Sequence, residues 1–237
     1  MHSGIQRKVK LKLTTEASRP LKILFFGDSI CVGQGISIHQ GWVAKIAADF
    51  STTGLPTSQE ILVINSSING RTTRQALEDM PYHVQGQRPD ILVIQFGLND
   101  CNHWATDRGL PRVSPEAFKA NLQEIVQRGK HFGARHILIN NNHPTVSIKE
   151  STPLDHQSFE DSNQIYNAVT RNLANESPDD IHFQDVERHF HELIKNGAKM
   201  SEFLLKDGLH LGVAGHQIYF DLIHPIIQDA VNQLNHE

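Results

Sequence analysis

Five short runs of apolar residues recur along this chain, and they constrain its fold more than any other feature of the sequence. They occupy residues 21–26, 61–67, 90–97, 135–141 and, less clearly, 181–186. Several runs are apolar at successive positions rather than at every second one, which is typical of strands that are covered on both faces. Amphipathic segments separate them. This alternation predicts an α/β fold in three layers (α/β/α), with helices on both faces of a mainly parallel, five-stranded sheet.

Four of the intervening segments have the features of helices. Ser114 followed by Pro115 is typical of a helix N-terminus, and Gly133 stands where the same helix should end. A proline at position 225 should bend or interrupt the last helix. The expected helices cover residues 41–50, 114–133, 161–176 and 214–234.

Length and charge narrow the class of protein. A chain of 237 residues suits one well-cored domain, which we expect to span residues 21–237 after an N-terminal arm of residues 1–20. The formal net charge of −4 does not indicate binding to nucleic acid or to an anionic membrane. No apolar run approaches the ~20 residues of a membrane helix, and the N-terminus lacks the apolar core of a secretory signal. We therefore expect a cytoplasmic protein without integral membrane association; the sequence does not indicate its oligomeric state.

Polar stretches follow the first three expected strands. GDS follows the first, SSINGRTT with Gly70 follows the second, and GLND with Asn99 follows the third, while DGLH (207–210) precedes the last helix. The carboxyl ends of parallel strands meet at one edge of a sheet, where ligands bind in such folds. We therefore expect the first three stretches to converge at this edge and the fourth to reach it from its loop.

These stretches contain the groups that a serine nucleophile needs. A serine hydroxyl requires a base within hydrogen-bonding reach, the base requires an orienting partner, and the oxyanion requires fixed donors. Ser29 is the expected nucleophile, with His210 as the base and Asp207 as its partner. The backbone N–H groups of Ser29 and Gly70 and the side-chain amide of Asn99 can donate to the oxyanion.

Four blocks of sequence resemble a known family. In order, Gly27-Asp28-Ser29, Gly70, Gly97-X-Asn99-Asp100 and Asp207-X-X-His210 resemble the four blocks of the SGNH hydrolase (GDSL esterase/lipase) superfamily. The resemblance extends over residues 21–236 and includes the small bacterial lysophospholipase/thioesterase-type members and their arylesterase relatives. The resemblance implies a flavodoxin-like sheet and a catalytic triad of Ser29, Asp207 and His210. It also implies an oxyanion hole made by Ser29, Gly70 and Asn99.

Two positions depart from the pattern of the family. Ile30 stands where leucine commonly follows the serine, which is a mild change, and Leu211 stands where proline commonly follows the histidine. The second change is expected to loosen the loop that carries the base. The G-x-S-x-G elbow of α/β-hydrolases is absent, which disfavours that fold.

Each stretch also has a structural alternative. Gly-Asp-Ser and Asp207-Gly208 occur in ordinary turns, Gly70 could be a turn glycine, and Asn99-Asp100 could cap a helix. Their joint occurrence at strand ends favours catalysis. Asp28 could influence the site electrostatically or contact the substrate, but a structural role as a helix cap or loop tie is favoured. Asp100 is expected to brace the loop that presents Asn99.

Further residues border the expected pocket. His103 and Trp104 could contact an acyl chain or a sugar ring, although Trp104 could equally cover the edge of the sheet. Residues 143–157 form a long loop that could be a lid or a pocket wall. Cys31 and Cys101 are expected to be free, partly buried thiols rather than a disulfide. The fifteen histidines include no recognised zinc spacing, so neither a metal nor another cofactor is expected.

The resulting hypothesis is a serine hydrolase of carboxylic esters whose partner is a small-molecule ester. Short-chain acyl or aryl esters are the first expectation, with lysophospholipids or thioesters next. A carbohydrate O-acetyl esterase and an acyltransferase are alternatives on the same fold. A flavodoxin-like binding module, in which Ser29 and His210 only contact a ligand, is the alternative outside enzymes.

Overall fold

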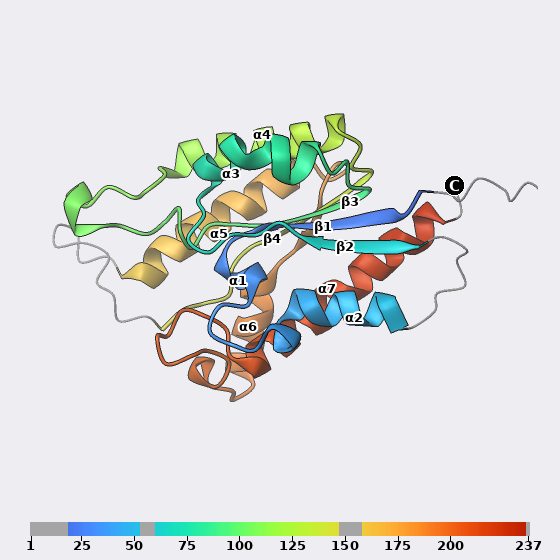
Figure 1. Ribbon diagram of the computed structural model, residues 1–237. Coiled ribbons are helices and arrows are strands. Elements are labelled where there is room, and N and C mark those ends of the chain that lie inside the picture. The colour runs from blue at the N-terminus through green and yellow to red at the C-terminus, as the bar shows by residue number, and fades with distance from the viewer. Residues whose placement is uncertain (1–18, 53–59, 147–157, 236–237) are drawn as a thin grey trace, which may run out of the picture.

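The computed structural model describes residues 19–52, 60–146 and 158–235 (Figure 1). All paired strands in its one five-stranded sheet run parallel, in the order β2-β1-β3-β4-β5. The strands are β1 (Leu21–Gly27), β2 (Ile61–Asn65), β3 (Ile91–Gln95), β4 (His136–Asn140) and β5 (His182–Gln184). The predicted fold is confirmed, and the strands after the first are shorter than the apolar runs suggested.

The burial of each strand follows its place in the sheet. Every residue of the central strand β3 is buried, whereas the residues of the edge strand β2 are only partly buried or exposed. Central strands of a parallel sheet are covered on both faces, and this explains why their sequences are apolar at successive positions.

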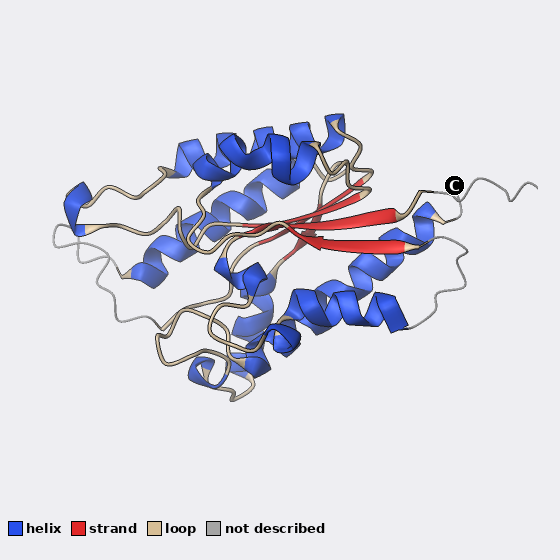
Figure 2. Ribbon diagram, viewed as in Figure 1, coloured by secondary structure: helices blue, strands red, loops and turns tan. Residues whose placement is uncertain are grey.

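Helices cover both faces of the sheet (Figure 2). One layer contains α3, α4 and α5, and the other contains α2, α6 and α7 (Figure 1). Within the second layer, Phe190 of α6 lies 6.1 Å from Tyr219 of α7, measured between ring centroids. The long helices are α2 (Trp42–Thr52), α3 (Thr73–Met80), α4 (Pro115–His131), α5 (Phe159–Glu176), α6 (Val186–Lys195) and α7 (Val213–Leu234). Among the described residues, we find no helix with the length and apolar character needed to cross a membrane.

Short helical segments complete the chain. They are α1 (Ser29–Val32), the 3-10 segments η1 (Ile38–Gln40), η3 (Ala105–Asp107) and η4 (Met200–Glu202), and the π-helical segment η2 (Pro81–Gln85).

Two helices were not expected from the sequence. At the start of α3, the Thr72 side chain accepts from the N–H of Gln75 while the Gln75 side chain accepts from the N–H of Thr72, so both ends of a capping box are present. At the start of α6, Asp185 accepts from the N–H of Arg188. Two signals in the sequence could have identified these helices. They are Thr72 followed three residues later by Gln75, and Asp185 just before an apolar stripe.

The last helix was expected to bend or break at Pro225, and the structure shows that it does not break. Helix α7 continues through Pro225 without the expected interruption. A proline removes one N–H donor and leaves the carbonyl four residues earlier without its helical partner. Here Pro225 and that residue, Asp221, both lie on the exposed side of the helix, so water can bond to the carbonyl. The buried face, which includes Ile223 and Ile227, holds the helix together.

The strand order determines where a site can form. In an order of 2-1-3-4-5, the chain moves to one side of β1 to build β2 and then to the other side to build β3. The loops after β1 and β3 therefore leave a crevice at the carboxyl ends of these strands, which is the usual ligand position in open α/β sheets.

Candidate active site

Ser29 occupies a tight turn between β1 and α1. The strand ends at Gly27, Asp28 is the N-cap, and Ser29 is the first residue of the helix. A side chain at position 27 would not fit, because a Cβ atom there would lie 2.7 Å from both the Cys31 sulfur and the Gln95 carbonyl oxygen. This close packing presents the Ser29 side chain, 7% exposed, at the carboxyl end of the strand.

The structure brings His210 and Asp207 to this serine. The distance from His210 Nε2 to Ser29 Oγ is 3.0 Å, and the distance from His210 Nδ1 to Asp207 Oδ2 is 2.6 Å. A carboxylate only accepts, so Nδ1 carries the hydrogen and Nε2 is free to accept from the serine hydroxyl. The three side chains therefore form one hydrogen-bonded chain in the order that general-base activation of serine requires.

Asp207 also shapes the turn that carries His210. Its Oδ1 atom accepts from the backbone N–H groups of Leu209 and His210, both at 3.0 Å. Partial burial raises the pKa of this carboxyl, but the hydrogen bonds from the His210 side chain and from these two N–H groups outweigh it, and the net pKa is lowered. The lowered pKa favours an ionised Asp207 beside the imidazole of His210.

The expected oxyanion donors lie on loops that are tied to the serine turn. Asn99 Nδ2 donates to Asp28 Oδ2 at 3.1 Å, which leaves its second N–H for a ligand. The N–H of Ile68 donates to the Gly27 carbonyl at 3.1 Å, so the loop with Gly70 is joined to the end of β1. Gly70 has φ of +77°, a conformation that favours glycine.

Asp100 braces this arrangement, as expected. It is fully buried, and its Oδ1 accepts from the N–H of Thr73 at 2.9 Å and from the Thr73 hydroxyl at 2.5 Å. The loop after β3 is thereby attached to the start of α3. Burial raises the pKa of Asp100 to about 6, against the lowering effect of the bonds from Thr73.

Asp28 is buried beneath the serine. Its side chain has no exposed surface; Oδ1 accepts from the N–H of Ile30 at 3.0 Å and Oδ2 accepts from Asn99. Burial raises the pKa of Asp28 to about 7, although the bond from Ile30 lowers it. These contacts support the helix-cap interpretation, and they leave no surface of Asp28 for a contact to substrate.

His103 and Trp104 lie on the loop between β3 and α4. Trp104 is 52% exposed, and the Arg112 guanidinium lies 4.5 Å from the centroid of its indole ring. Arg112 also donates to the Gly70 carbonyl at 3.0 Å, so this ring neighbours the expected oxyanion loop. A surface hollow of about 520 Å³ lies here, lined by Thr72, Arg74, Gln75, Trp104, Asp107, Leu110, Pro111 and Arg112. Arg112 was not predicted from the sequence, because its contacts with Gly70 and Trp104 form only in the folded chain.

The remaining sequence expectations have mixed outcomes. Cys31 and Cys101 are free, as expected, but both are buried rather than partly buried. Of the loop expected to be a lid or a pocket wall, residues 143–146 are described and 147–157 lie outside the described residues, as does most of the N-terminal arm. In the parts of the chain that the structure describes, no three His, Cys, Asp or Glu side chains are grouped to hold a metal ion.

Curated proteins and solved structures resemble this chain. It is 30% identical over 129 residues to the esterase TesA of Pseudomonas aeruginosa. The aligned residues cover 54% of this chain and 58% of TesA. It is 29% identical to an arylesterase of Vibrio mimicus over the same shares of the two chains. The match therefore spans less than two thirds of the length of either relative.

Two solved structures show the same fold. The acetylxylan esterase Axe2 of Geobacillus stearothermophilus has a TM-score of 0.67 at 24% identity, covering 88% of this chain and 94% of Axe2. A lipase/acylhydrolase of Enterococcus faecalis has a TM-score of 0.69 at 23% identity, covering 88% and 96%. Residues 25–218 match the model of one family. The expected SGNH relationship is thus confirmed, and the chain belongs to the GDSL-like Lipase/Acylhydrolase family.

Proposed function

We propose that this protein hydrolyses carboxylic esters through an acyl-enzyme on Ser29. The observation that carries the proposal is the hydrogen-bonded chain from Asp207 through His210 to the Ser29 hydroxyl, at 2.6 and 3.0 Å. It lies at the crevice between the ends of β1 and β3, on the fold of a family of lipases and acylhydrolases.

The reaction follows from the direction of these hydrogen bonds. His210 Nε2 takes the hydroxyl proton while Ser29 Oγ attacks the ester carbonyl, and Asp207 stabilises the imidazolium that forms. Collapse of the tetrahedral intermediate breaks the bond to the alcohol, which leaves with the proton from His210. Water then attacks the acyl-enzyme with the same base, releasing the acid and restoring the serine.

The oxyanion would be held by the N–H groups of Ser29 and Gly70 and by the free N–H of Asn99. Donors of this kind act strongly when they are already oriented before charge develops. The bond from Asn99 to the buried Asp28 supports this role, because it holds the amide in place before substrate arrives.

The favoured substrates are short-chain acyl or aryl esters, and one observation supports O-acetylated carbohydrate as a second candidate. The hollow beside Gly70 combines the exposed ring of Trp104 with polar and charged side chains, among them Gln75 and Asp107. An aromatic face with polar neighbours suits a sugar ring. Thioester, lysophospholipid and acyl-transfer activity, like a cytoplasmic location, stay predictions.

The test is a panel of p-nitrophenyl esters of increasing acyl length, run beside an acetylated xylooligosaccharide and with a competing alcohol. We expect hydrolysis of the short esters and covalent labelling of Ser29 by an organophosphonate. Ser29→Ala should lower kcat by at least about 10⁴-fold with the fold intact. A protein that binds but neither cleaves nor becomes labelled is instead a binding module.

A further inference from the structure

The chain that follows β4 is buried but has no strand beside it. Residues 141–146, here called the strap, leave the sheet after Asn140, and all but Val146 are buried. Buried backbone N–H and C=O groups need hydrogen-bond partners. The strap therefore raises the question of which groups bond to its backbone.

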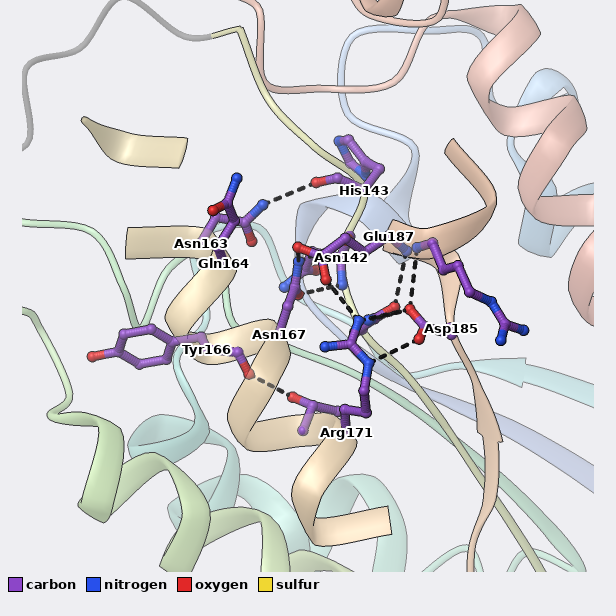
Figure 3. A network of polar contacts seen from close by, with 12 residues as sticks. Asn142, His143, Asn163, Gln164, Tyr166, Asn167, Arg171, Asp185 and Glu187 are labelled. Carbon is purple, nitrogen blue, oxygen red and sulfur yellow. Dashed lines mark hydrogen bonds and ion pairs between the residues drawn. The ribbon is translucent and has the colours of Figure 1, made fainter. Parts of the chain in front are cut away.

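Side chains of α5 supply much of the answer. Asn167 Oδ1 accepts from the N–H of Asn142 at 2.8 Å, and Asn167 Nδ2 donates to the Asn142 carbonyl at 3.0 Å. Asn163 Nδ2 donates to the His143 carbonyl at 3.0 Å, as Figure 3 shows. Glu160 accepts from the N–H of Thr145 at 2.6 Å. The backbone of the strap is thus held in one position by side chains.

The imidazole of His143 is fully buried, with a partner on each nitrogen. Nε2 lies 2.9 Å from the carbonyl oxygen of Leu209, and Nδ1 lies 2.8 Å from the Tyr219 hydroxyl. A carbonyl only accepts, so Nε2 carries the hydrogen, and the Tyr219 hydroxyl must donate to Nδ1. Burial lowers the pKa of His143 to about 4, in agreement with a neutral ring.

These contacts reach the turn that carries the catalytic base. Leu209 and Gly208 are the two residues between Asp207 and His210, and both of their carbonyls accept from the strap. Leu209 accepts from the His143 ring, and Gly208 accepts from the N–H of Val146 at 2.9 Å. Asp207 satisfies N–H groups of the same turn from within. Within the turn, the Asp207 side chain therefore accepts from backbone N–H groups, and the backbone carbonyls of the turn accept from the strap.

The proline that commonly follows the histidine in the family is absent here, and this turn was expected to be loose. Instead, Leu211 is buried and forms a short antiparallel bridge with Leu204. The N–H of Leu205 donates to the His210 carbonyl at 2.7 Å. These bonds join the two ends of the loop, and the strap bonds to the turn between them.

We propose that the strap positions the catalytic base, with the His143 Nε2–H and the Val146 N–H holding the Asp207–His210 turn so that His210 reaches Ser29. His143 is then a positioning residue, since it acts through Leu209 and touches no reacting atom. This inference rests on the proposed ester hydrolysis. It predicts a defect in kcat rather than in substrate binding when the strap loses its donors.

The decisive comparison is His143→Asn against His143→Gln. Both residues are polar amides, but only glutamine is long enough to place an N–H near the position of Nε2, while asparagine reaches only the Nδ1 position beside Tyr219. We expect His143→Asn to lower kcat on p-nitrophenyl acetate about 10–100-fold with KM within about twofold, since small misplacements of a catalytic group have effects of this size. His143→Gln should stay within about threefold of wild type. Equal kcat values in the two variants, with both folded, would overturn the proposal.

A second pair protects the test against misfolding. Val146 is 48% exposed, so Val146→Pro removes its N–H without disturbing the core, and Val146→Ala keeps the N–H. We expect a lower kcat only in the proline variant. If Val146→Pro and every folded His143 variant match wild type, the proposal fails.

A measurement without turnover separates this inference from the proposed function. The low-field proton signal of His210 Nδ1–H, assigned by its loss in His210→Ala, reports on the bond to Asp207. We expect it in the wild type and in His143→Gln, and we expect its loss by exchange in His143→Asn. If the wild type cleaves no ester, the proposed function fails while this signal still decides whether the strap holds the base.

Discussion

The serine turn and the histidine turn meet in one site, but they are held in different ways. Ser29 lies two residues after the end of the central strand β1, and its turn is held by the packing of Gly27 against Cys31 and Gln95 and by the N-cap Asp28. His210 follows no strand, and its turn depends on the strap more than 60 positions away, where His143 bonds to Leu209. The Ser29 turn is thus placed by the end of a central strand of the sheet, whereas the His210 turn is placed by contacts with a loop. Substitutions near Ser29 should therefore lower the rate of the chemical step directly. Substitutions around His210 should lower it by moving the imidazole away from the Ser29 hydroxyl.

The largest expected effect in this comparison is that of Asp207→Asn. The asparagine oxygen can still accept from the N–H groups of Leu209 and His210, so the turn should keep its shape. Its amide would face His210 Nδ1 and favour the wrong tautomer, and kcat should fall about 10³–10⁴-fold with a smaller change in KM. Steady-state kinetics with circular dichroism as the folding control tests this. A fall in kcat of less than tenfold would show that the backbone bonds of the turn orient His210 well enough without the carboxylate.

Asn99→Ala tests the serine side of the site. If the amide donates to the oxyanion, kcat should fall about 10²–10³-fold with little change in melting temperature. Asn102→Ala, in the same loop, is the matched control and should keep wild-type kcat. Equal rates in the two variants would assign Asn99 to scaffolding.

Asp28→Asn sharpens the comparison through pH. Its pKa is raised from 3.8 to about 7 by burial, so the folded state binds a proton that the unfolded state releases. The stability from this proton is present below about pH 4 and is lost as pH rises through about 7. Asparagine cannot lose that proton. The melting temperature of the variant relative to wild type should therefore rise between pH 5 and pH 8, whatever its value at pH 5. A constant difference across this range would contradict the raised pKa.

The smallest effect is expected at the hollow beside Gly70. Trp104→Ala should raise KM for an acetylated xylooligosaccharide about fivefold, the loss expected for one aromatic contact of about 1 kcal/mol. The KM for p-nitrophenyl acetate should not change. Tyr82→Ala, which removes another exposed aromatic ring outside this hollow, is the control. An equal rise in KM for both substrates would show that Trp104 stabilises the loop rather than binding a sugar.

Much of the site could be predicted from the sequence because strand ends are local features. The apolar runs located the sheet, and the candidate site residues Ser29, Gly70 and Asn99 were predicted from the stretches that follow these runs. The helices α3 and α6 were missed, since they are short and their caps are polar residues that also occur in loops. The contact of His143 with Leu209 could not be predicted, because a histidine beside a proline gives no sign of burial.

The sequence by itself determined the alternation of strands and helices and the positions of the reactive side chains, because the period of apolar residues and the chemistry of Ser, His and Asp are properties of the chain. Only the tertiary structure decided that Asp28 bonds to Asn99, that Arg112 joins Trp104 to the Gly70 loop, and that the strap bonds to the Asp207–His210 turn. Each of these depends on a hydrogen bond between segments far apart in sequence. Such a contact exists only once the sheet order has brought the segments together.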